Sequence, residues 1–481
     1  MTEEDKREAA QYLSSLLNLN LDFILERLSQ NKYFVWLVRK IPMEVVDQIK
    51  SYNIRGLSFI KESKRYYPNK SLASHVIGFA GIDNNGLEGL ELQFDHYLQG
   101  QPGWTQILRD ARQRELLIEK GFIPPRDGFN LVLTIDETIQ FIAERALEKA
   151  FVKHNAKAAS IIVMNPKTGE ILALANRPTY NLEESSNSQP ESRTNRTLVY
   201  VYEPGSVFKI VTLAAALEED LVKETDKFFC EYGTYRVANH ILHDHQPHGI
   251  LTLRGIIEQS SNIGTTKVAQ KLGPHLIYKY ARRFRFGMRT GIDLTGEVQG
   301  VLKPPSLWSK TSIGAIPIGQ EVTVTALQLV CAIAAIANDG VYMKPFVVKY
   351  IKDNHDELIK SFESQEVDHV ISVETAKRMK DILTGVVDDG TGKLAKIEGI
   401  KVAGKTGTAQ KVIGGQYSQN RFFASFIGFA PVEDAKLAVA VVFDEPHPSH
   451  FGGTVSAPVF KEVVENALKY LATNEENINI H

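Results

Sequence analysis

Apolar residues recur along this chain with two different spacings, and the spacing changes from segment to segment. In seven segments they return every three to four positions, which is the pattern of a helix with one buried face. Thr2 and Asp5 open the first of these segments as a capping residue and an acidic first-turn residue do. The predicted helices are 2–17, 43–52, 137–154, 206–219, 254–272, 325–339 and 459–471.

Short runs of β-branched and apolar residues predict strands on both sides of the helical middle of the chain. Three strands precede it and three follow it, at 131–136, 159–164, 170–175, 399–404, 422–429 and 437–443. This order predicts an α+β domain whose central sheet joins early and late segments of the chain.

The remaining segments show neither period. The stretch 78–91 is dense in glycine and acidic residues, and 106–130 contains Pro124-Pro125 before Arg126-Asp127-Gly128, which is typical of a hinge. The polar stretch 181–195 is expected to be an exposed loop. We therefore predict an N-terminal domain, a linker, a second domain and a tail, at 1–105, 106–130, 131–475 and 476–481.

Length and composition are those of a globular protein with more than one domain. The chain has 481 residues and a net charge of −2, so no basic excess favours nucleic acid as a partner. Its longest apolar stretch, 327–337, is shorter than the roughly 18–20 residues that cross a membrane. The acidic, polar start is not that of a signal peptide. Cys230 and Cys331 have no metal-ligand spacing, and we predict no disulfide.

Three short motifs supply the candidate chemistry, and their order carries the signal. Ser-x-x-Lys stands at Ser206 to Lys209, Ser-x-Asn at Ser260 to Asn262, and Lys-Thr-Gly-Thr at Lys405 to Thr408. Each motif alone recurs by chance, for example at Ser29 to Lys32. A second Lys-Thr-Gly, Lys167 to Gly169, falls in a predicted turn between two strands and needs no chemical role.

The first two motifs have the residue types that acyl transfer needs. Ser206 follows Glu203-Pro204-Gly205, a helix-start signal, and backbone N–H groups at a helix N-terminus can stabilise an oxyanion. Lys209 lies one turn later on the same face, and a lysine whose pKa is lowered by burial can take the serine proton. Ser260 can relay a proton between Lys209 and a leaving amine.

The other motif residues suit substrate binding. Asn262 can hold a substrate amide with its own donor and acceptor. Lys405 supplies positive charge near the reacting centre, and Gly407 lets a substrate backbone come close. Thr406 or Thr408 can bind a substrate carboxylate, and the Thr408 N–H can complete an oxyanion hole. Strict strand alternation would put Lys405 and Thr408 on opposite faces, and the sequence leaves open which side chains point inward.

A zinc site is the rival constellation. Four histidines surround Asp244 at positions 240, 243, 245 and 248. Their spacing fits no standard zinc pattern, and Pro247 and Gly249 mark a loop. We therefore predict a solvated loop and no metal.

With these motifs the chain resembles the class B penicillin-binding proteins of the cell-division (FtsI) type. The resemblance covers nearly the whole chain. Other family-like segments are Arg65-Tyr66-Tyr67-Pro68, Gly86-Leu87-Glu88-Gly89-Leu90-Glu91, Leu133-Thr134-Ile135-Asp136, Gly319-Gln320, Gly390-Thr391-Gly392 and the stretch 452–460.

The resemblance implies a serine-type peptidoglycan D,D-transpeptidase without a cofactor. Its fold would be a transpeptidase domain, a central antiparallel sheet flanked by helices, after a mixed pedestal domain. Ser206 would be the acylated nucleophile and Lys209 its base. The other implied roles are a proton shuttle and peptide binding for Ser260 and Asn262, and carboxylate binding for Lys405, Thr406 and Thr408. The donor would be a stem peptide ending in D-Ala-D-Ala, and β-lactams would acylate the same serine.

The resemblance also implies a setting. The enzyme would cross-link the wall at the division septum, on the periplasmic side of the cell membrane, with divisome proteins docking on the pedestal. The family's membrane helix and its Arg-Gly-x-Ile-x-Asp-Arg-x-Gly strand are absent, so we expect a truncated form with a partly formed pedestal. The alternatives are an elongation-type transpeptidase, a D,D-carboxypeptidase, a β-lactamase and a non-catalytic β-lactam receptor.

Overall fold

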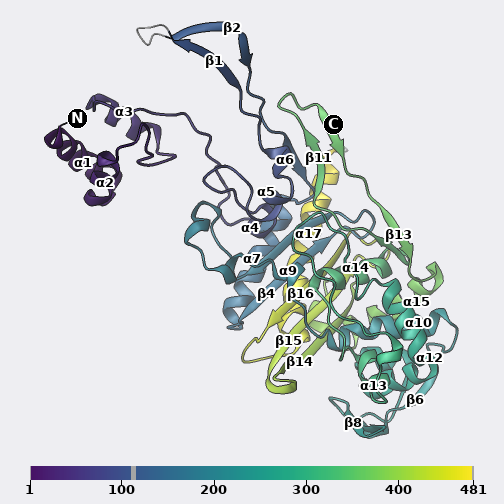
Figure 1. Cartoon of the computed structure of the whole chain (residues 1–481). Coiled ribbons are helices and arrows are strands. Elements are labelled where there is room, and N and C mark those ends of the chain that lie inside the picture. The colour runs from purple at the N-terminus through teal and green to yellow at the C-terminus, as the bar shows by residue number, and fades with distance from the viewer. Residues whose placement is uncertain (1, 110–114, 479–481) are drawn as a thin grey trace. The chain divides into compact units, whose positions relative to one another are not determined.

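The computed structural model describes residues 2–109 and 115–478 (Figure 1). The chain forms two compact units, which are described separately. The smaller consists of residues up to 68 together with 80–85, and the larger consists of 69–79 and the chain from 86 onward. This division differs from the predicted boundary at 105, because Leu90 and Phe94 are already buried in the main core of the larger unit.

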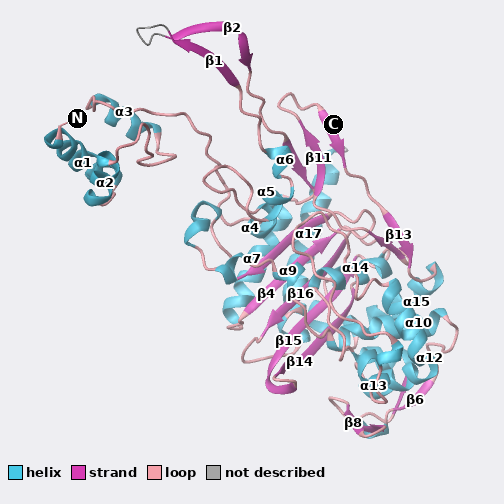
Figure 2. Cartoon of the chain, viewed as in Figure 1, coloured by secondary structure: helices cyan, strands magenta, loops and turns pink. Residues whose placement is uncertain are grey.

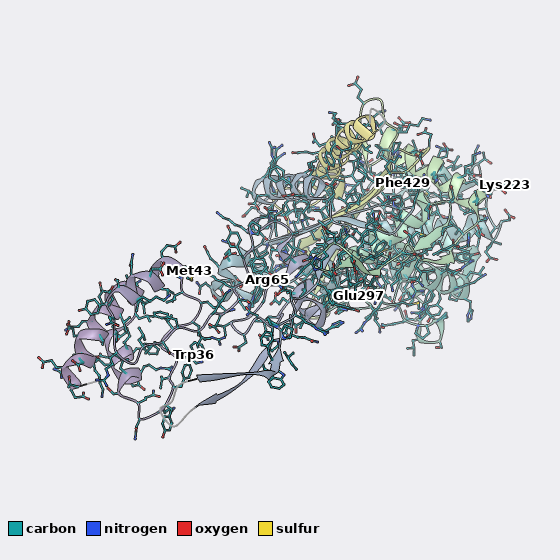
Figure 3. The ribbon with its side chains drawn as sticks, turned by 90° about the horizontal axis from the view of Figure 1, so that it is seen from above. Trp36, Met43, Arg65, Lys223, Glu297 and Phe429 are labelled. Carbon is teal, nitrogen blue, oxygen red and sulfur yellow. The ribbon has the colours of Figure 1, made fainter. Side chains whose placement is uncertain are left out.

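Three helices build the smaller unit: α1 (Glu3–Leu17), α2 (Leu21–Ser29) and α3 (Met43–Ser51). Thr2 and Asp5 form a capping box, which confirms the predicted start of α1. Trp36 and Met43 both belong to this unit (Figure 3). Its small buried core consists of Ala10, Leu13, Ile24 and Ile49.

The segment predicted as a linker contains most of a β-hairpin. Strand β1 (Trp104–Arg109) pairs antiparallel with β2 (Glu115–Ile123), and Trp104 lies opposite Ile123. The pairing ends before Pro124 and Pro125, which have no N–H to donate to a ladder. The hinge-like Pro-Pro pair therefore marks the end of a strand.

The larger unit is built around a five-stranded antiparallel sheet with the order β14-β15-β16-β4-β5. Figure 2 shows these strands among helices. Their bounds are Ala403–Ile413, Gln416–Ala430, Leu437–Asp444, Ala158–Met164 and Ile171–Arg177 in that order. Early and late segments of the chain thus pair with each other, which confirms the predicted α+β sheet.

Alternate residues of each strand face two different cores. On β4, Ile161 and Val163 belong to one core, and Ile162 and Met164 belong to the other. The first core is closed by α7 (Glu137–Lys153) and α17 (Ala457–Ile478). The second is closed by α14 (Ala326–Ala337), α10 (Lys209–Glu218) and their neighbours. Phe429 of β15, which is labelled in Figure 3, belongs to this second core.

Every residue of α14 is buried, so the longest apolar stretch of the sequence is a core helix. Thr325 and Gln328 form a capping box at its start. In the ranges that the structure describes, no helix is long and apolar enough to cross a membrane.

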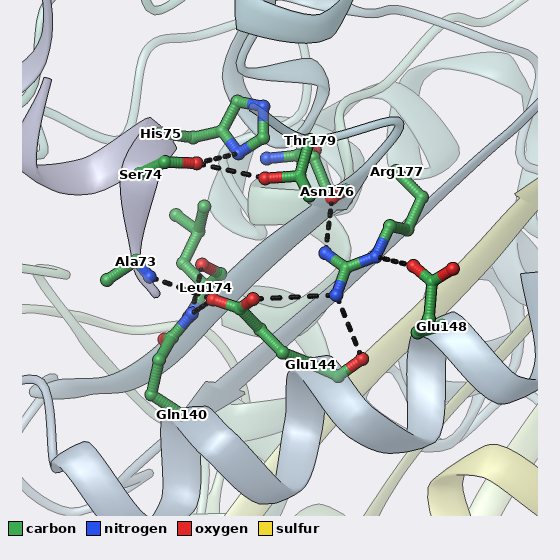
Figure 4. A network of polar contacts seen from close by, with 10 residues as sticks. All are labelled: Ala73, Ser74, His75, Gln140, Glu144, Glu148, Leu174, Asn176, Arg177 and Thr179. Atoms are coloured by element: carbon green, nitrogen blue, oxygen red, sulfur yellow. Dashed lines mark hydrogen bonds and ion pairs between the residues drawn. The ribbon is translucent and has the colours of Figure 1, made fainter. Parts of the chain in front are cut away.

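A polar network ties the start of the larger unit to its sheet (Figure 4). The Ala73 N–H donates to the Glu144 carboxylate on α7, which also accepts from the Gln140 amide at 2.9 Å. The Arg177 guanidinium at the end of β5 donates to Glu144 and Glu148. These contacts hold the chain before the sheet against α7.

Two segments of the structure differ from the elements that the sequence predicts for them. The stretch 181–195, expected to be a loop, contains the 3₁₀ turn η1 (Leu182–Asn187) and α8 (Pro190–Arg193), because Asn181 caps the turn and Leu182 is buried. The other elements are α4 (Ser74–Ile77), α5 (Gly89–Gln93), α6 (Asp95–Leu98), α9 (Arg196–Val199), α13 (Ser312–Ala315), α15 (Val373–Asp388), α16 (Gly452–Val455), β3 (Asn130–Leu133), β10 (Val341–Met343), β11 (Val348–Lys352), β12 (Leu358–Ser361) and β13 (Glu366–His369).

The second difference is the predicted helix 254–272. It is divided into α11 (Leu253–Glu258) and α12 (Asn262–Arg283), and α12 itself is kinked at Gly273 before Pro274. Two small two-stranded sheets contact this pair. One pairs β6 (Lys227–Phe229) with β9 (Ile250–Thr252), and the other is the hairpin of β7 (Thr234–Val237) and β8 (His240–His243). The break between α11 and α12 falls on the Ser-x-Asn motif.

Candidate active site

Ser206 lies in a 3₁₀ turn, η2 (Gly205–Phe208), that leads into α10. The α-helix therefore begins at Lys209 and not at Ser206 as predicted. Residues three apart in a 3₁₀ turn lie on the same side, so the tighter turn still aligns Ser206 with Lys209. Ser206 is partly exposed, whereas Val207 and Phe208 are buried.

Ser260 lies at the junction of two helices. The Ser261 N–H donates to the Ile256 carbonyl and the Ser260 N–H donates to the Ile257 carbonyl, which is a Schellman ending of α11. Ser260 takes the left-handed position that glycine usually fills, with φ 56°. Ser261 then caps α12 by accepting from the Gly264 N–H.

The Lys209 amine is fully buried and donates to three oxygens. They are the Ser260 carbonyl at 2.6 Å, the Ser260 hydroxyl at 3.2 Å and the Asn262 side-chain carbonyl at 2.8 Å. Burial lowers the pKa of Lys209 to about 7, and the charge of Asp244 partly opposes this shift. Within the described chain no hydrogen bond joins Ser206 to Lys209, and catalytic hydrogen bonds are often long before substrate binds.

The Lys405 amine approaches the same hydroxyl from the sheet. It donates to the Ser260 hydroxyl at 2.9 Å and to the Thr406 carbonyl at 3.1 Å. Burial lowers the pKa of Lys405 well below its ordinary value, and the nearby charge of Lys209 lowers it further. Two buried amines therefore share one hydroxyl, and their mutual repulsion favours a state in which at most one is charged.

Asp244, which was predicted to lie in a solvated loop, contacts the Ser-x-Asn motif instead. Its carboxylate accepts from the Ser261 hydroxyl at 2.6 Å and from the N–H groups of Asn262 and Ile263 at 2.5 and 3.0 Å. The Asn262 amide also donates to the His243 carbonyl at 2.9 Å. An aspartate ahead of a Ser-x-Asn motif was the available signal, since a carboxylate at a helix N-terminus is favourable.

The Lys-Thr-Gly-Thr motif lies inside β14, the edge strand of the sheet. Lys405 reaches Ser260, whereas the Thr408 hydroxyl accepts from the Gly452 N–H at 3.2 Å and the Thr406 hydroxyl lies 2.7 Å from that of Thr391. The side chains of Lys405 and Thr408 thus engage different parts of the molecule, as strand alternation suggests.

Gly407 serves the packing of the site. A Cβ at this position would lie 2.6 Å from Val207 Cγ2 and 2.2 Å from Ser425 Oγ, so the bare backbone lets β14 approach the Ser206 turn. Gly205 allows a similar close approach. Its φ is 56°, and a Cβ there would lie 2.9 Å from the Thr408 carbonyl oxygen. Glycines therefore bring the Ser206 turn and the edge strand together. Gly407 was predicted to let substrate approach, whereas its contacts in the structure are with the packed residues Val207 and Ser425.

The histidine loop does not form a metal centre. Over residues 2–109 and 115–478, no group of three or more His, Cys, Asp or Glu side chains could hold a metal ion. The Asp244 carboxylate is engaged at the start of α12, and His240–His243 form strand β8. Cys230 and Cys331 are both buried and free.

A cavity of about 710 Å³ lies in the smaller unit, lined by residues between Leu13 and Glu62. None of the motif residues lines it. The cavity and the cluster of motifs are therefore separate features of the chain.

Comparison with known proteins agrees with this geometry. The sequence matches the penicillin binding protein transpeptidase domain over residues 159–465 and the penicillin-binding protein dimerisation domain over residues 1–133. It is 36% identical to "Stage V sporulation protein D" of Bacillus subtilis, over 97% of this chain and 74% of that protein. It is 32% identical to "Peptidoglycan D,D-transpeptidase FtsI" of Escherichia coli, over 95% of this chain and 76% of that protein.

A solved structure with a similar fold is penicillin binding protein 3 of Mycobacterium tuberculosis in complex with aztreonam. It is 30% identical with a TM-score of 0.78, and the match covers 85% of this chain and 90% of the other. The chain belongs to the class B penicillin-binding proteins of the FtsI type, and it is an enzyme of the peptidoglycan D,D-transpeptidase class.

Proposed function

We propose that this transpeptidase cross-links peptidoglycan stem peptides through an ester on Ser206. The observation that carries the proposal is the Ser260 hydroxyl, which lies 3.2 Å from the Lys209 amine and 2.9 Å from the Lys405 amine. A hydroxyl between a neutral base and a second amine can pass a proton in either direction. Because burial lowers the pKa of Lys209 to about 7, much of this amine is neutral at pH 7 and can accept a proton.

In the first half of the reaction, Ser206 Oγ attacks the carbonyl carbon of the penultimate D-Ala. The serine proton passes to the neutral Lys209 amine. The N–H groups of Ser206 and Thr408 stabilise the oxyanion, and Lys405 with the hydroxyls of Thr406 and Thr408 binds the terminal carboxylate. The proton then moves through Ser260 to the nitrogen of the leaving D-Ala, the C–N bond breaks, and the acyl group stays on Ser206 as an ester.

In the second half, an amine of a neighbouring stem peptide attacks the ester. The C–O bond to Ser206 breaks and the proton lost by the amine returns to the serine oxygen. Asn262 holds the amide of the donor peptide throughout. A β-lactam follows only the first half, because its nitrogen remains attached in the opened ring and cannot leave the site.

We place this activity in septal wall synthesis on the periplasmic side of the cell membrane. The wall polymer lies outside the cytoplasm, and the chain is similar to FtsI of Escherichia coli. The N-terminal unit contains none of the motif residues, which suits docking of other division proteins better than chemistry. A second candidate is wall synthesis during sporulation, favoured by the similarity to stage V sporulation protein D.

The chemical proposal is tested by mass spectrometry of the intact protein after incubation with benzylpenicillin. We expect one covalent adduct, located on a peptide that contains Ser206, and none in Ser206→Ala. The matched control is Ser58→Ala, which removes the exposed serine of a chance Ser-x-x-Lys match and should label normally. Full labelling of Ser206→Ala would exclude this serine as the nucleophile.

The cellular proposal is tested by depleting the protein in its source cell. Filaments without septa are expected for a septal enzyme. Normal vegetative division with defective spores would select the sporulation role. Round cells would assign the protein to elongation, and normal shape with altered stem-peptide length would indicate a D,D-carboxypeptidase.

A further inference from the structure

A cluster of histidine and phenylalanine rings joins two loops beside the site. His450 stacks on Phe422 of β15, with ring centroids 4.0 Å apart, and lies 4.4 Å from Phe451. His245, from the loop between β8 and β9, meets Phe451 at 5.1 Å. His245 and His447 are exposed, and His450 is partly buried. The cluster therefore presents imidazoles to solvent from both loops.

Both loops are attached to catalytic motifs. His245 follows Asp244, whose carboxylate binds the start of the Ser-x-Asn helix. Phe451 precedes Gly452, whose N–H donates to the Thr408 hydroxyl. The contact between His245 and Phe451 thus connects the helical side of the site with its strand side. Both of these rings are exposed, whereas Lys209 and Lys405 are buried.

The charged groups around the cluster are engaged elsewhere. The Asp244 carboxylate accepts three hydrogen bonds at the start of α12. Next to Phe422, the Glu445 carboxylate pairs with Lys411 at 2.7 Å and lies 3.7 Å from Arg421. Burial lowers the pKa of His450, and the neighbouring imidazoles of His245 and His447 lower it further. An anion placed between these rings would relieve that repulsion.

We propose that His245 and His450 form a carboxylate-binding subsite beside the active site, which takes a second acidic group of the acyl donor. The inference rests on the proposed acylation of Ser206. Phe422 and Phe451 hold the rings, and the imidazoles attract the carboxylate once they are protonated. The subsite is separate from Lys405, Thr406 and Thr408, which take the terminal carboxylate of the donor.

The experiment compares two penicillins that differ by one carboxylate. Carbenicillin carries a carboxylate on its side chain and benzylpenicillin does not. The second-order acylation rate is measured for each from pH 5.5 to 8, and the carbenicillin to benzylpenicillin ratio is taken at each pH. Titration of Lys209 affects both compounds equally and cancels in the ratio. We expect the ratio to increase about two- to fivefold as the pH falls, the size of a partly exposed ion pair.

The variants are His450→Phe, which keeps a ring for Phe422 to stack on, and His245→Asn. Either should flatten the ratio while leaving benzylpenicillin acylation close to wild type. His355→Phe, an exposed histidine in the turn between β11 and β12, is the control and should keep the wild-type ratio. A ratio independent of pH in the wild type, or an equal increase in both cluster variants, would overturn the subsite. Loss of benzylpenicillin labelling in the wild type would instead overturn the proposed acylation itself.

Discussion

Removing the charge of Asp244 tests the electrostatics of the site most directly. Asp244→Asn keeps an oxygen that can accept from the N–H groups of Asn262 and Ile263 but loses the negative charge that raises the pKa of Lys209. The active form of Lys209 is the neutral amine. Acylation should therefore increase with pH and level off above the pKa of this lysine.

The size of the effect follows from the pKa of about 7. About half of the Lys209 amines are neutral at pH 7 and about a tenth at pH 6, compared with roughly one in 3,000 at pH 7 for an unperturbed lysine. Loss of a nearby opposite charge lowers a buried pKa by about one unit. In Asp244→Asn, about half of the amines would then be neutral at pH 6, so the acylation rate there should increase about fivefold while the plateau above pH 8 changes little.

The assay is stopped-flow acylation by a fluorescent or chromogenic β-lactam between pH 5 and 9, in buffers of constant ionic strength. The control is Asp220→Asn, which removes the charge of an exposed aspartate. Its pH profile should match that of the wild type. Thermal unfolding at pH 6 and pH 8 checks that each variant is folded.

Two results would refute the reasoning. A wild-type profile without an acid limb between pH 6 and 8 would mean that Lys209 is not the neutral base. An Asp244→Asn profile with an unchanged midpoint would mean that the carboxylate positions Asn262 but does not act on the lysine.

Three further outcomes are expected. Lys209→Ala should lower the acylation rate by about 10²–10⁴ while the protein still folds; a normal rate would move the base role, with Lys405 the first candidate. Gly407→Ala should destabilise the fold by about 1–3 kcal/mol in urea unfolding and slow acylation, because its Cβ would lie 2.2 Å from Ser425 Oγ. Gly249→Ala, whose Cβ meets only the Tyr232 ring at 3.6 Å, is its control, and equal stability of the two would contradict the packing role. The penicilloyl enzyme should persist for many minutes by mass spectrometry, and rapid turnover would favour a β-lactamase.

The local spacing of apolar residues was enough to predict many of the helices and strands. The period of apolar residues identified α1 and α7, because one buried face requires that spacing whatever the helix packs against. Four of the five strands of the central sheet were also identified, since strands such as β4 and β16 are apolar on both faces. The strand predicted at 399–404 overlaps only the start of β14 (Ala403–Ile413). The hairpin β1–β2 was missed because Pro124-Pro125 was interpreted as a hinge.

The order of three motifs along the chain predicted residues that the fold brings together, and their catalytic roles stay predictions. Hydrogen bonds join Lys209 to Ser260 and Asn262, and Lys405 to Ser260, while Ser206 lies one turn before Lys209. Sequence determines this much because the chemistry needs particular residue types, and the spacing Ser-x-x-Lys places two of them on one side of a single turn.

Only the tertiary structure decided how these groups behave. The pKa of Lys209 depends on burial by segments far away in the chain, and Asp244 reaches the start of α12 through the packing of β8 against that helix. The left-handed turn at Ser260 depends on the end of one helix and the start of the next. Residue type and local period are properties of short segments, whereas burial, charge coupling and capping across the chain exist only once distant segments have packed.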